Sequence, residues 1–394
     1  MAEILDIKKS IILYESIAHC EAYSHLPYAS STFNNSDEIR IAVQHQDLCL
    51  LPSKSTLHFY GRMRKADSTV VSATIKMINM AVCHMFEEIR YELNGVEIDR
   101  CENVGITSVM KGYASLSPGQ QNILENAGWI VNEDNNKLTD ANGYFDVSVP
   151  LSFILGFAED YQRVIVNAKH ELILIRSNTD QNAYVVTAES ENVKITIQKI
   201  EWIVPYITMS DKYKIEVLNS ITSDPSIPIN FRTWEPATTK HIWAIKTTNQ
   251  LEKPRFVILG FQTARKNQSN QNPSEFDLCS IRDVKLFLNS QSYPYGNLNL
   301  NITNNQYALM YDMYENFQSA YYGKEAEPLM AKKDFLNKAS LYIIDCSKQN
   351  ESIKSGPVDI RLEFESSAQF SNQTAAYCLI IHDRMIEYNP TAAL

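Results

Sequence analysis

The chain has 394 residues, which is enough for two or three domains and for a large core that needs neither disulfides nor metals. Hydrophobic residues make up 44% and charged residues 21%, a balance that excludes a disordered or fibrous protein. With 36 Lys and Arg against 46 Asp and Glu, the net charge of −10 argues against a dedicated nucleic-acid-binding protein.

The seven cysteines lack the spacing that a disulfide framework or a zinc site requires. No two of them form a CxxC pair, and their number is odd. We therefore expect reduced, buried thiols and a reducing compartment. The cysteines stand at positions 20, 49, 83, 101, 279, 346 and 378.

A secretory signal peptide is not expected. Glu15 interrupts the apolar run that follows Lys8 and Lys9, and no small-residue cleavage site follows it cleanly. No stretch of the sequence reaches the roughly 18 apolar residues that a membrane-spanning helix needs. We therefore expect a protein that is not secreted through a signal peptide.

Most of the chain has the pattern of half-buried antiparallel β-strands. Apolar and polar residues alternate in runs that are separated by clusters of Asn, Ser, Gly and Pro. Leu93-Asn94-Gly95-Val96 predicts a tight hairpin, because Asn-Gly tolerates the positive φ of such a turn. The continuous apolar runs 256–259 and 377–381 predict strands that are buried on both faces. The alternating runs are 39–43, 57–63, 193–197, 284–288 and 360–364.

One helix is predicted from the sequence Ser117-Pro118-Gly119-Gln120, which has the N-cap, the N1 proline and the N3 glutamine of a capping box. We expect this helix to end at Gly128. Its inward-facing residues are predicted to be Ile123, Leu124 and Ala127.

A second helix is predicted over 306–320, where aromatic and methionine side chains recur at three- and four-residue steps. This stripe would serve either as a ligand platform or as packing in the core or an interface, and we favour packing. A third, short helix is predicted over 211–220. The stripe consists of Tyr307, Met310, Tyr311, Tyr314, Phe317 and Tyr321.

Strands dominate and the few helices fall between them, which is the pattern of an all-β sandwich or jelly roll rather than of alternating β-α units. One sandwich of about 100 to 200 residues does not account for the length of the chain. An internal repeat indicates two similar halves, because 88–95 matches 283–290 at an offset of 195 residues. Asn94 and Asn289 should therefore occupy equivalent turns.

Two further matches support the repeat. Phe59-Tyr60-Gly61 corresponds to Ile258-Leu259-Gly260, and a Pro-Leu pair follows the helical stretch of each half, at 150–151 and at 328–329. We expect two β domains in tandem. They cover residues 1–200 and 201–394, are joined near 198–210 at Pro205, and are packed together by Trp202.

The sequence contains no motif for catalysis, and no catalytic, cofactor-binding or metal-ligating residue is predicted, nor any cofactor. His382-Asp383-Arg384 is the most enzyme-like triplet, but consecutive strand residues point to opposite faces. We interpret it as a solvated strand end. Glu87-Glu88 and Asp99-Arg100 are interpreted as exposed strand charges. The densest basic segments, 62–65 and 332–333, are likewise interpreted as strand-end charges.

Several segments of the second half resemble, as an ordered set, the major capsid protein of Polinton (Maverick) elements and adintovirus-like viruses. An endogenous or a virophage-related copy is left open. The resemblance covers residues 200–394 well and extends more loosely into the first half through 93–97 and 169–176. The segments that carry it are 231–235, 253–263, 288–295, 344–351, 358–361 and 376–384.

The resemblance implies a double jelly roll, which is two tandem eight-stranded jelly rolls in one chain with a few short helices between the strands. It further implies a structural, non-enzymatic major capsid protein of the virion, whose homotrimers form pseudo-hexameric capsomers that tile an icosahedral shell. The expected partners are further copies of the chain and a single jelly-roll penton or minor capsid protein, with no specific nucleic acid. An internal membrane is left open.

Two other functions are compatible with a double sandwich. A carbohydrate-active enzyme would require two or more facing carboxylates in a cleft between the halves. A lectin-like binding protein would present exposed aromatic side chains in a shallow groove.

Overall fold

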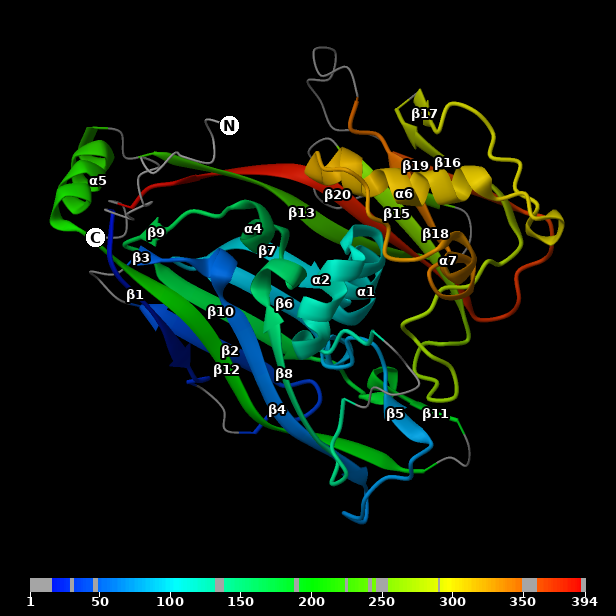
Figure 1. The fold of residues 1–394 in the computed structure, drawn as a ribbon, viewed down its shortest axis with the longest axis horizontal. Helices are drawn as coiled ribbons and strands as arrows, with labels where there is room; N and C mark the ends of the chain where they lie inside the picture. Colours follow the sequence, from blue (N-terminus) through cyan, green and yellow to red (C-terminus); the bar gives the residue numbers. More distant parts are fainter. Residues whose placement is uncertain are drawn as a thin grey trace, which may run out of the picture.

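The computed structural model describes residues 16–28, 32–44, 49–131, 138–187, 191–223, 226–239, 243–245, 254–289, 291–348 and 360–390. Two β sandwiches stand side by side, and they follow one another in the chain (Figure 1). Helices of both halves lie between the two sandwiches.

The first sandwich has two sheets that face one another across an apolar core. In one sheet β12 pairs with β1, β4 and β3, while β8 and β9 extend it; the other sheet has the order β2-β10-β6-β7, and β5 pairs with β11 outside both. The strands are β1 (Ile17–His25), β2 (Glu38–Gln44), β3 (Cys49–Leu50), β4 (Thr56–Lys65), β5 (Ile75–Met77), β6 (Phe86–Leu93), β7 (Val96–Glu102), β8 (Tyr144–Pro150), β9 (Ile165–Val166), β10 (Lys169–Arg176), β11 (Tyr184–Val186) and β12 (Val193–Met209).

The second sandwich also has two sheets, with the orders β13-β20-β15-β18 and β14-β19-β16-β17. Its strands are β13 (Ile227–Thr239), β14 (Trp243–Ile245), β15 (Pro254–Thr263), β16 (Ile281–Leu288), β17 (Gln291–Tyr293), β18 (Leu341–Asp345), β19 (Ile360–Ser366) and β20 (Thr374–Tyr388).

The two sandwiches have the same eight-stranded jelly-roll connection. In each, the first strand pairs with the last, and the fourth and fifth strands form a hairpin in the opposite sheet. The predicted all-β double jelly roll with a few short helices is therefore confirmed. The equivalent strands are β1 and β13, β2 and β14, β4 and β15, β6 and β16, β7 and β17, β8 and β18, β10 and β19, and β12 and β20.

The predicted repeat lies in equivalent strands. The hairpin of β6 and β7 corresponds to the hairpin of β16 and β17, and the turn residues Asn94 and Asn289 have φ of 51° and 55°. The Pro-Leu match was wrong. Leu151 follows β8, whereas Pro328 precedes the equivalent strand β18, so the two pairs are not counterparts.

The helices are α1 (Val104–Ser115), α2 (Pro118–Ile123), α3 (Leu151–Ile154), α4 (Gly156–Asp160), α5 (Asp211–Ser223), α6 (Ala308–Tyr322) and α7 (Lys332–Lys338). The capping box that starts α2 is present, and the helical stretch ends at Gly128 with φ of 89°. Leu124 and Ala127 are buried as predicted, but Ile123 is 77% exposed. The prediction for Ile123 was wrong because the helix tightens to a 3-10 turn after it, which changes the face that points inward.

The helices predicted over 306–320 and 211–220 are present as α6 and α5. Most of the aromatic stripe of α6 is buried, with Tyr311 half-buried, so its role is packing. α5 has no buried residue, and it extends from one end of the molecule between β12 and β13 (Figure 1).

The connection between the jelly rolls differs from the predicted joint. The position 200/201 falls inside β12, the last strand of the first roll, so we propose that α5 divides the two domains. Trp202 was predicted to pack the two halves together, and this prediction was wrong. Its indole N–H donates to Ser55 Oγ at 3.0 Å and its ring meets the edge of Tyr91, both within the first roll.

None of the seven cysteines forms a disulfide. Five are buried, as expected, but Cys20 on β1 is exposed and Cys279 is half-buried. Among the described residues, no helix is long and apolar enough to cross a membrane.

Candidate functional site

The interface between the two jelly rolls holds a cluster of buried and partly buried charged residues. The first roll contributes α1, α4 and β7, and the second contributes β13, α6 and the loop 264–280. Charged groups are seldom buried unless they are paired, so their partners indicate what this interface does.

Lys111 of α1 is 3% exposed. Its ammonium group donates to Glu159 Oε1 at 2.7 Å and lies 3.6 Å from the centre of the Trp234 ring. Burial lowers the pKa of Lys111, while the Glu159 carboxylate acts in the opposite direction. An ion pair and a cation–π contact therefore hold this lysine against β13 of the second roll.

Glu159 of α4 accepts two further hydrogen bonds from the second roll. The hydroxyls of Tyr321 and Tyr322 on α6 each donate to its carboxylate at 2.8 Å. Burial, and then the adjacent carboxylate, raise the pKa of both phenols. Three donors thus fix both carboxylate oxygens.

Asp160 and Arg232 connect the two rolls directly. The guanidinium group donates to both oxygens of Asp160, at 2.6 and 2.8 Å, and the backbone N–H of Arg232 donates to Oδ2 at 2.8 Å. A Cβ atom added to Gly156 would lie 1.8 Å from the carbonyl oxygen of Arg232. α4 therefore covers the free edge of β13 at a distance that only glycine permits.

Asp99 is 1% exposed, so the prediction of an exposed strand charge was wrong. Its carboxylate accepts from Phe157 N at 2.8 Å and from Thr233 Oγ1 at 2.5 Å, and burial raises its pKa. A register shift in the β6–β7 pairing accompanies two consecutive buried residues, Ile98 and Asp99, and breaks the alternation on which the prediction depended.

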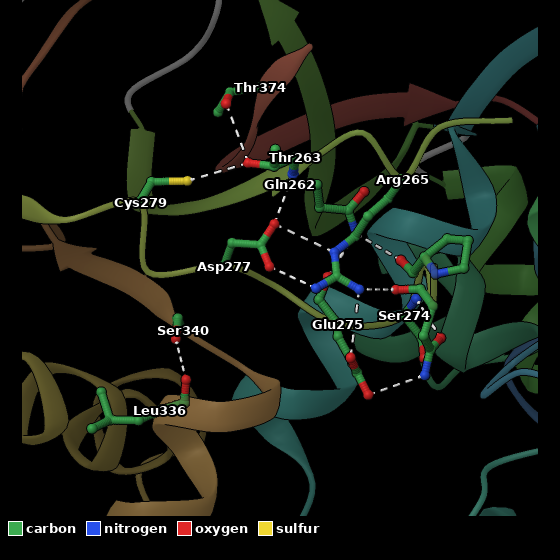
Figure 2. Close-up of polar contacts among 12 residues, drawn as sticks. Gln262, Thr263, Arg265, Ser274, Glu275, Asp277, Cys279, Leu336, Ser340 and Thr374 are labelled. Carbon is green, nitrogen blue, oxygen red and sulfur yellow. Dashed lines mark hydrogen bonds and ion pairs between the residues drawn. The ribbon is translucent and has the colours of Figure 1, made fainter. Parts of the chain in front are cut away.

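Arg265 organises the long loop that follows β15 (Figure 2). Its guanidinium group donates to Asp277 Oδ1 at 2.6 Å and to the carbonyl of Asn272 at 2.7 Å, and lies 3.5 Å from Glu275 Oε2. Gln262 donates to the carbonyls of Pro273 and Glu275 from the same side. One partly buried arginine thus gives the loop a defined shape.

This loop contacts the first roll at three places. Tyr113 of α1 donates to the carbonyl of Ser274 at 3.0 Å, and Asn182 donates to Asn267 at 2.9 Å. The backbone N–H of Val186 donates to the carbonyl of Ser269 at 2.6 Å. The loop therefore fastens the second roll to the first at the end away from α4.

His382 was predicted to lie at a solvated strand end, and this prediction was wrong. β20 continues to Tyr388, so His382 is in the middle of the strand, 7% exposed, with Nε2 3.5 Å from Glu235. The error has a long-range cause, because β13 pairs with β20 along its whole length. Glu87 is exposed as predicted, whereas Glu88 is half-buried beside Arg90.

The basic segment 62–65 lies at the end of β4, which finishes at Lys65 as predicted, whereas 332–333 is not at a strand end. Arg62 stacks over the ring of Tyr144 at 4.1 Å, in the middle of the outer face of β4. Lys332 and Lys333 begin α7. These positions are single surface charges rather than a continuous basic face.

The interface carboxylates Glu159, Asp160 and Asp99 are each bonded to partners, rather than facing one another in a cleft as an enzyme would require. None of these three residues lines the cavities of about 960, 260 and 860 Å³ in the described chain. The cavity of about 960 Å³ is lined by Asp180 and Glu191, but these pair with Arg176 and Lys65. Within the described ranges, no group of three His, Cys, Asp or Glu side chains is arranged to hold a metal ion.

Reasoning from the sequence missed the residues of this interface. One signal was available, because Lys111 is the only charged residue of the otherwise apolar and small run 104–115. The acidic pair Glu159 and Asp160 gave no such signal, since it follows a short segment without clear periodicity. The partner of Asp160 on β13, Arg232, lies more than 70 residues further along the chain.

Comparison with protein families finds a match to the double jelly roll-like domain over residues 75–386. No curated protein sequence matches the chain.

Several solved structures are similar over nearly the whole chain. A chain of the Sputnik virophage structure has a TM-score of 0.63 and 10% identity, covering 98% of this chain and 90% of that one. The Faustovirus major capsid protein has a TM-score of 0.62 and 10% identity, with coverages of 97% and 94%. The mavirus major capsid protein has a TM-score of 0.54 and 10% identity, with coverages of 100% and 94%. At this identity the likeness establishes the fold.

Proposed function

Since the chain belongs to the double jelly roll-like domain family, we propose that it is a major capsid protein, a structural protein that self-associates to build the shell of a virion. The observation that carries the proposal is the interface between the rolls, where α4 and its charged neighbours join two equivalent sandwiches into one rigid unit. Its buried charges serve cohesion, since each of those described above is paired across or beside the interface. Major capsid proteins of Faustovirus and mavirus have the same fold.

The proposed assembly is a homotrimer that forms a pseudo-hexameric capsomer, and such capsomers would tile an icosahedral shell. The support comes from the equivalent strands β1 and β13. α4 covers the edge of β13, whereas β1 is exposed along eight of its nine residues and pairs only with β12 in the described chain. In a closed ring of three chains, the second roll of a neighbour would cover β1.

Exposed apolar side chains near β1 are consistent with this contact. Ile17 is 38% exposed, Tyr23 48% and Leu26 60%. α5 adjoins them, because the N–H of Ser210, just before this helix, donates to the carbonyl of Ser16. An unpaired strand edge beside apolar side chains is a template for another chain.

Light scattering tests the trimer. The wild-type protein should have about three times the chain mass of 44.9 kDa, and negative-stain microscopy should show capsomers or shells. Leu26→Asp should lower the measured mass toward one chain without unfolding it. Ile123→Asp, a substitution of an apolar residue that is 77% exposed on α2, is the matched control and should leave the trimer intact. A wild-type protein that stays monomeric at high concentration and in assembly buffers would contradict the proposal.

The remaining expectations follow from the capsid role. We propose the virion as the location, a single jelly-roll penton or minor capsid protein as a further partner, and no specific nucleic acid. Membership of the Polinton, Maverick or adintovirus lineage is proposed from the segments of the second half, among them 231–235 and 376–384. No observation favours the enzyme or lectin alternatives.

A further inference from the structure

A cavity of about 260 Å³ lies between the two rolls, beside the loop that Arg265 organises. Both halves of the chain line it, so any molecule bound there would touch both. The lining residues that bear on its chemistry are His84, Glu87, Asn103, Gly105, Ile106 and Asn178 of the first roll, and Lys266 and Tyr377 of the second.

The N-terminus of α1 opens onto this cavity. Asn103, the N-cap, has a left-handed φ of 47°, and its side chain makes no cap hydrogen bond. The first helical bond is donated by Thr107, which leaves the amide groups of Gly105 and Ile106 outside the helical pattern. No acidic residue occupies the first turn. This helix end therefore presents uncompensated N–H groups and a partial positive charge.

His84 provides an independent sign of a ligand. The residue is 6% exposed, and its Nε2 atom has no hydrogen-bond partner in the structure. Its ring packs on Gly105, where an added Cβ atom would lie 2.3 Å from the ring Cγ. A buried polar atom without a partner is costly, and such atoms in native proteins are normally satisfied by water or by a ligand.

Lys266 adds a formal charge to the cavity wall. It stands on the exposed loop that contacts Asn182, so its ammonium group can reach the cavity from the second roll. Glu87 is the only acidic residue that lines the cavity within the described chain, and it is exposed, so its carboxylate is free to turn toward water.

We propose that this cavity binds a small oxyanion of the phosphate class, held by the first-turn amides of α1, the ring of His84 and the ammonium group of Lys266. The anion fits the chemistry because the amide and ammonium groups are donors that favour negative charge. Contact with both rolls means that the bound anion stabilises their association by mass action.

Inorganic phosphate is the probe for the first experiment. Calorimetric titration of the assembled wild-type protein at fixed ionic strength should show saturable binding, with a matching rise in melting temperature over chloride. Lys266→Ala should weaken phosphate binding by about tenfold or more, because a charge-assisted hydrogen bond is lost. Lys333→Ala on α7, an exposed lysine of the same roll that does not line the cavity, is the control and should bind like wild type.

A crystal grown with selenate locates the anion independently of any variant. An anomalous peak within hydrogen-bond distance of the Gly105 amide and the Lys266 ammonium group is the expected result. Titration without saturable binding, equal binding by Lys266→Ala and wild type, or selenate peaks only elsewhere would each overturn the proposal. The oligomeric mass of the same samples is measured separately, so a failure here leaves the capsid proposal unaffected.

Discussion

β1 and β13 hold the same position in their jelly rolls, because each pairs with the last strand of its own roll. β13 is closed in by α4 and β7, so Phe231, Thr233 and Trp234 are all buried. β1 pairs only with β12 in the described chain, and eight of its nine residues are exposed. Strand order therefore does not determine whether a strand at a given position in the roll is buried or exposed. What decides is the neighbouring element, which among the described residues covers β13 and leaves β1 exposed.

The largest effect is expected where α4 meets β13. Gly156→Val should destabilise the protein by roughly 3 kcal/mol or more, because its Cβ would collide with the backbone of Arg232 and force the two rolls apart. Urea denaturation measures the change. Gly296→Val is the control, since a Cβ there meets nothing within 4 Å and should cost about 0.5 kcal/mol or less. Equal effects of the two variants would show that α4 and β13 need not be in close contact.

A second pair of variants compares the covered interface with the exposed sheet of the first roll. Lys111→Met leaves Glu159 buried without its cation and should cost about 3 kcal/mol in the free energy of unfolding. Lys199→Met removes a lysine that is 48% exposed and paired with Glu201, and should cost about 0.5 kcal/mol. Denaturant midpoints of the two proteins decide this, and a smaller loss for Lys111→Met would contradict the structural role of the interface.

The turns of the equivalent hairpins, β6–β7 and β16–β17, should lose similar stability when a valine is introduced. In this they differ from the first strands, β1 and β13, which have different surroundings. Gly95→Val should cost about 1 to 2 kcal/mol, because its φ is 79° and no neighbouring atom crowds the site. Asn289→Val in the second roll should cost a similar amount, since its φ is 55°. Thermal melts of both variants test the prediction, and a loss confined to one roll would break the equivalence.

The smallest expected effect is a difference in pH dependence between the two regions. Burial opposes ionisation of Glu201 on the exposed sheet, but hydrogen bonds from Lys199 and His58 hold its pKa at about 2. Its stabilising contribution is therefore present above the ordinary value of 4.5 and is lost as the pH falls toward 2. Glu201→Gln should make the protein less sensitive to acid over this range, as measured by denaturant midpoints from pH 5 to pH 3.

Asp99 in the covered interface should behave in the opposite way. Burial raises its pKa, so its contribution is greatest below the ordinary value of 3.8 and is lost as the pH rises through the folded-state pKa. Asp99→Asn removes the titrating carboxyl but keeps only one of the two oxygens that accept from Phe157 and Thr233. It should therefore lose stability at both pH values, and its loss relative to the wild type should be smaller at pH 7 than at pH 4. A change of the same sign as that of Glu201→Gln would contradict this reasoning.

Local chemistry explains which parts of the fold could be predicted from the sequence. Asn94-Gly95 specified its own turn, the capping box at Ser117 specified the start of α2, and period-two alternation marked the strands. The wrong predictions share a different cause. Asp99 and His382 are buried by contacts with strands far away in the chain, and no local pattern records which element will cover a face.

The candidate site was less predictable than the fold for the same reason. Lys111 and Glu159 are 48 positions apart, and Asp160 and Arg232 are 72 apart, so neither pair leaves a spacing that a motif search would detect. Trp202 shows the reverse error. A large aromatic residue near the expected joint suggested a contact between domains, but the strand that carries it is central to the first sheet.

The pairing of the first strand with the last in each roll has a consequence for the order of folding during synthesis. The first sheet cannot be completed until the ribosome has made Met209, and the second cannot be completed until it has made Tyr388. The first roll therefore exists for a time with Lys111, Glu159 and Asp160 facing water. Charged groups at this surface keep the half-made protein soluble until β13 emerges and covers them.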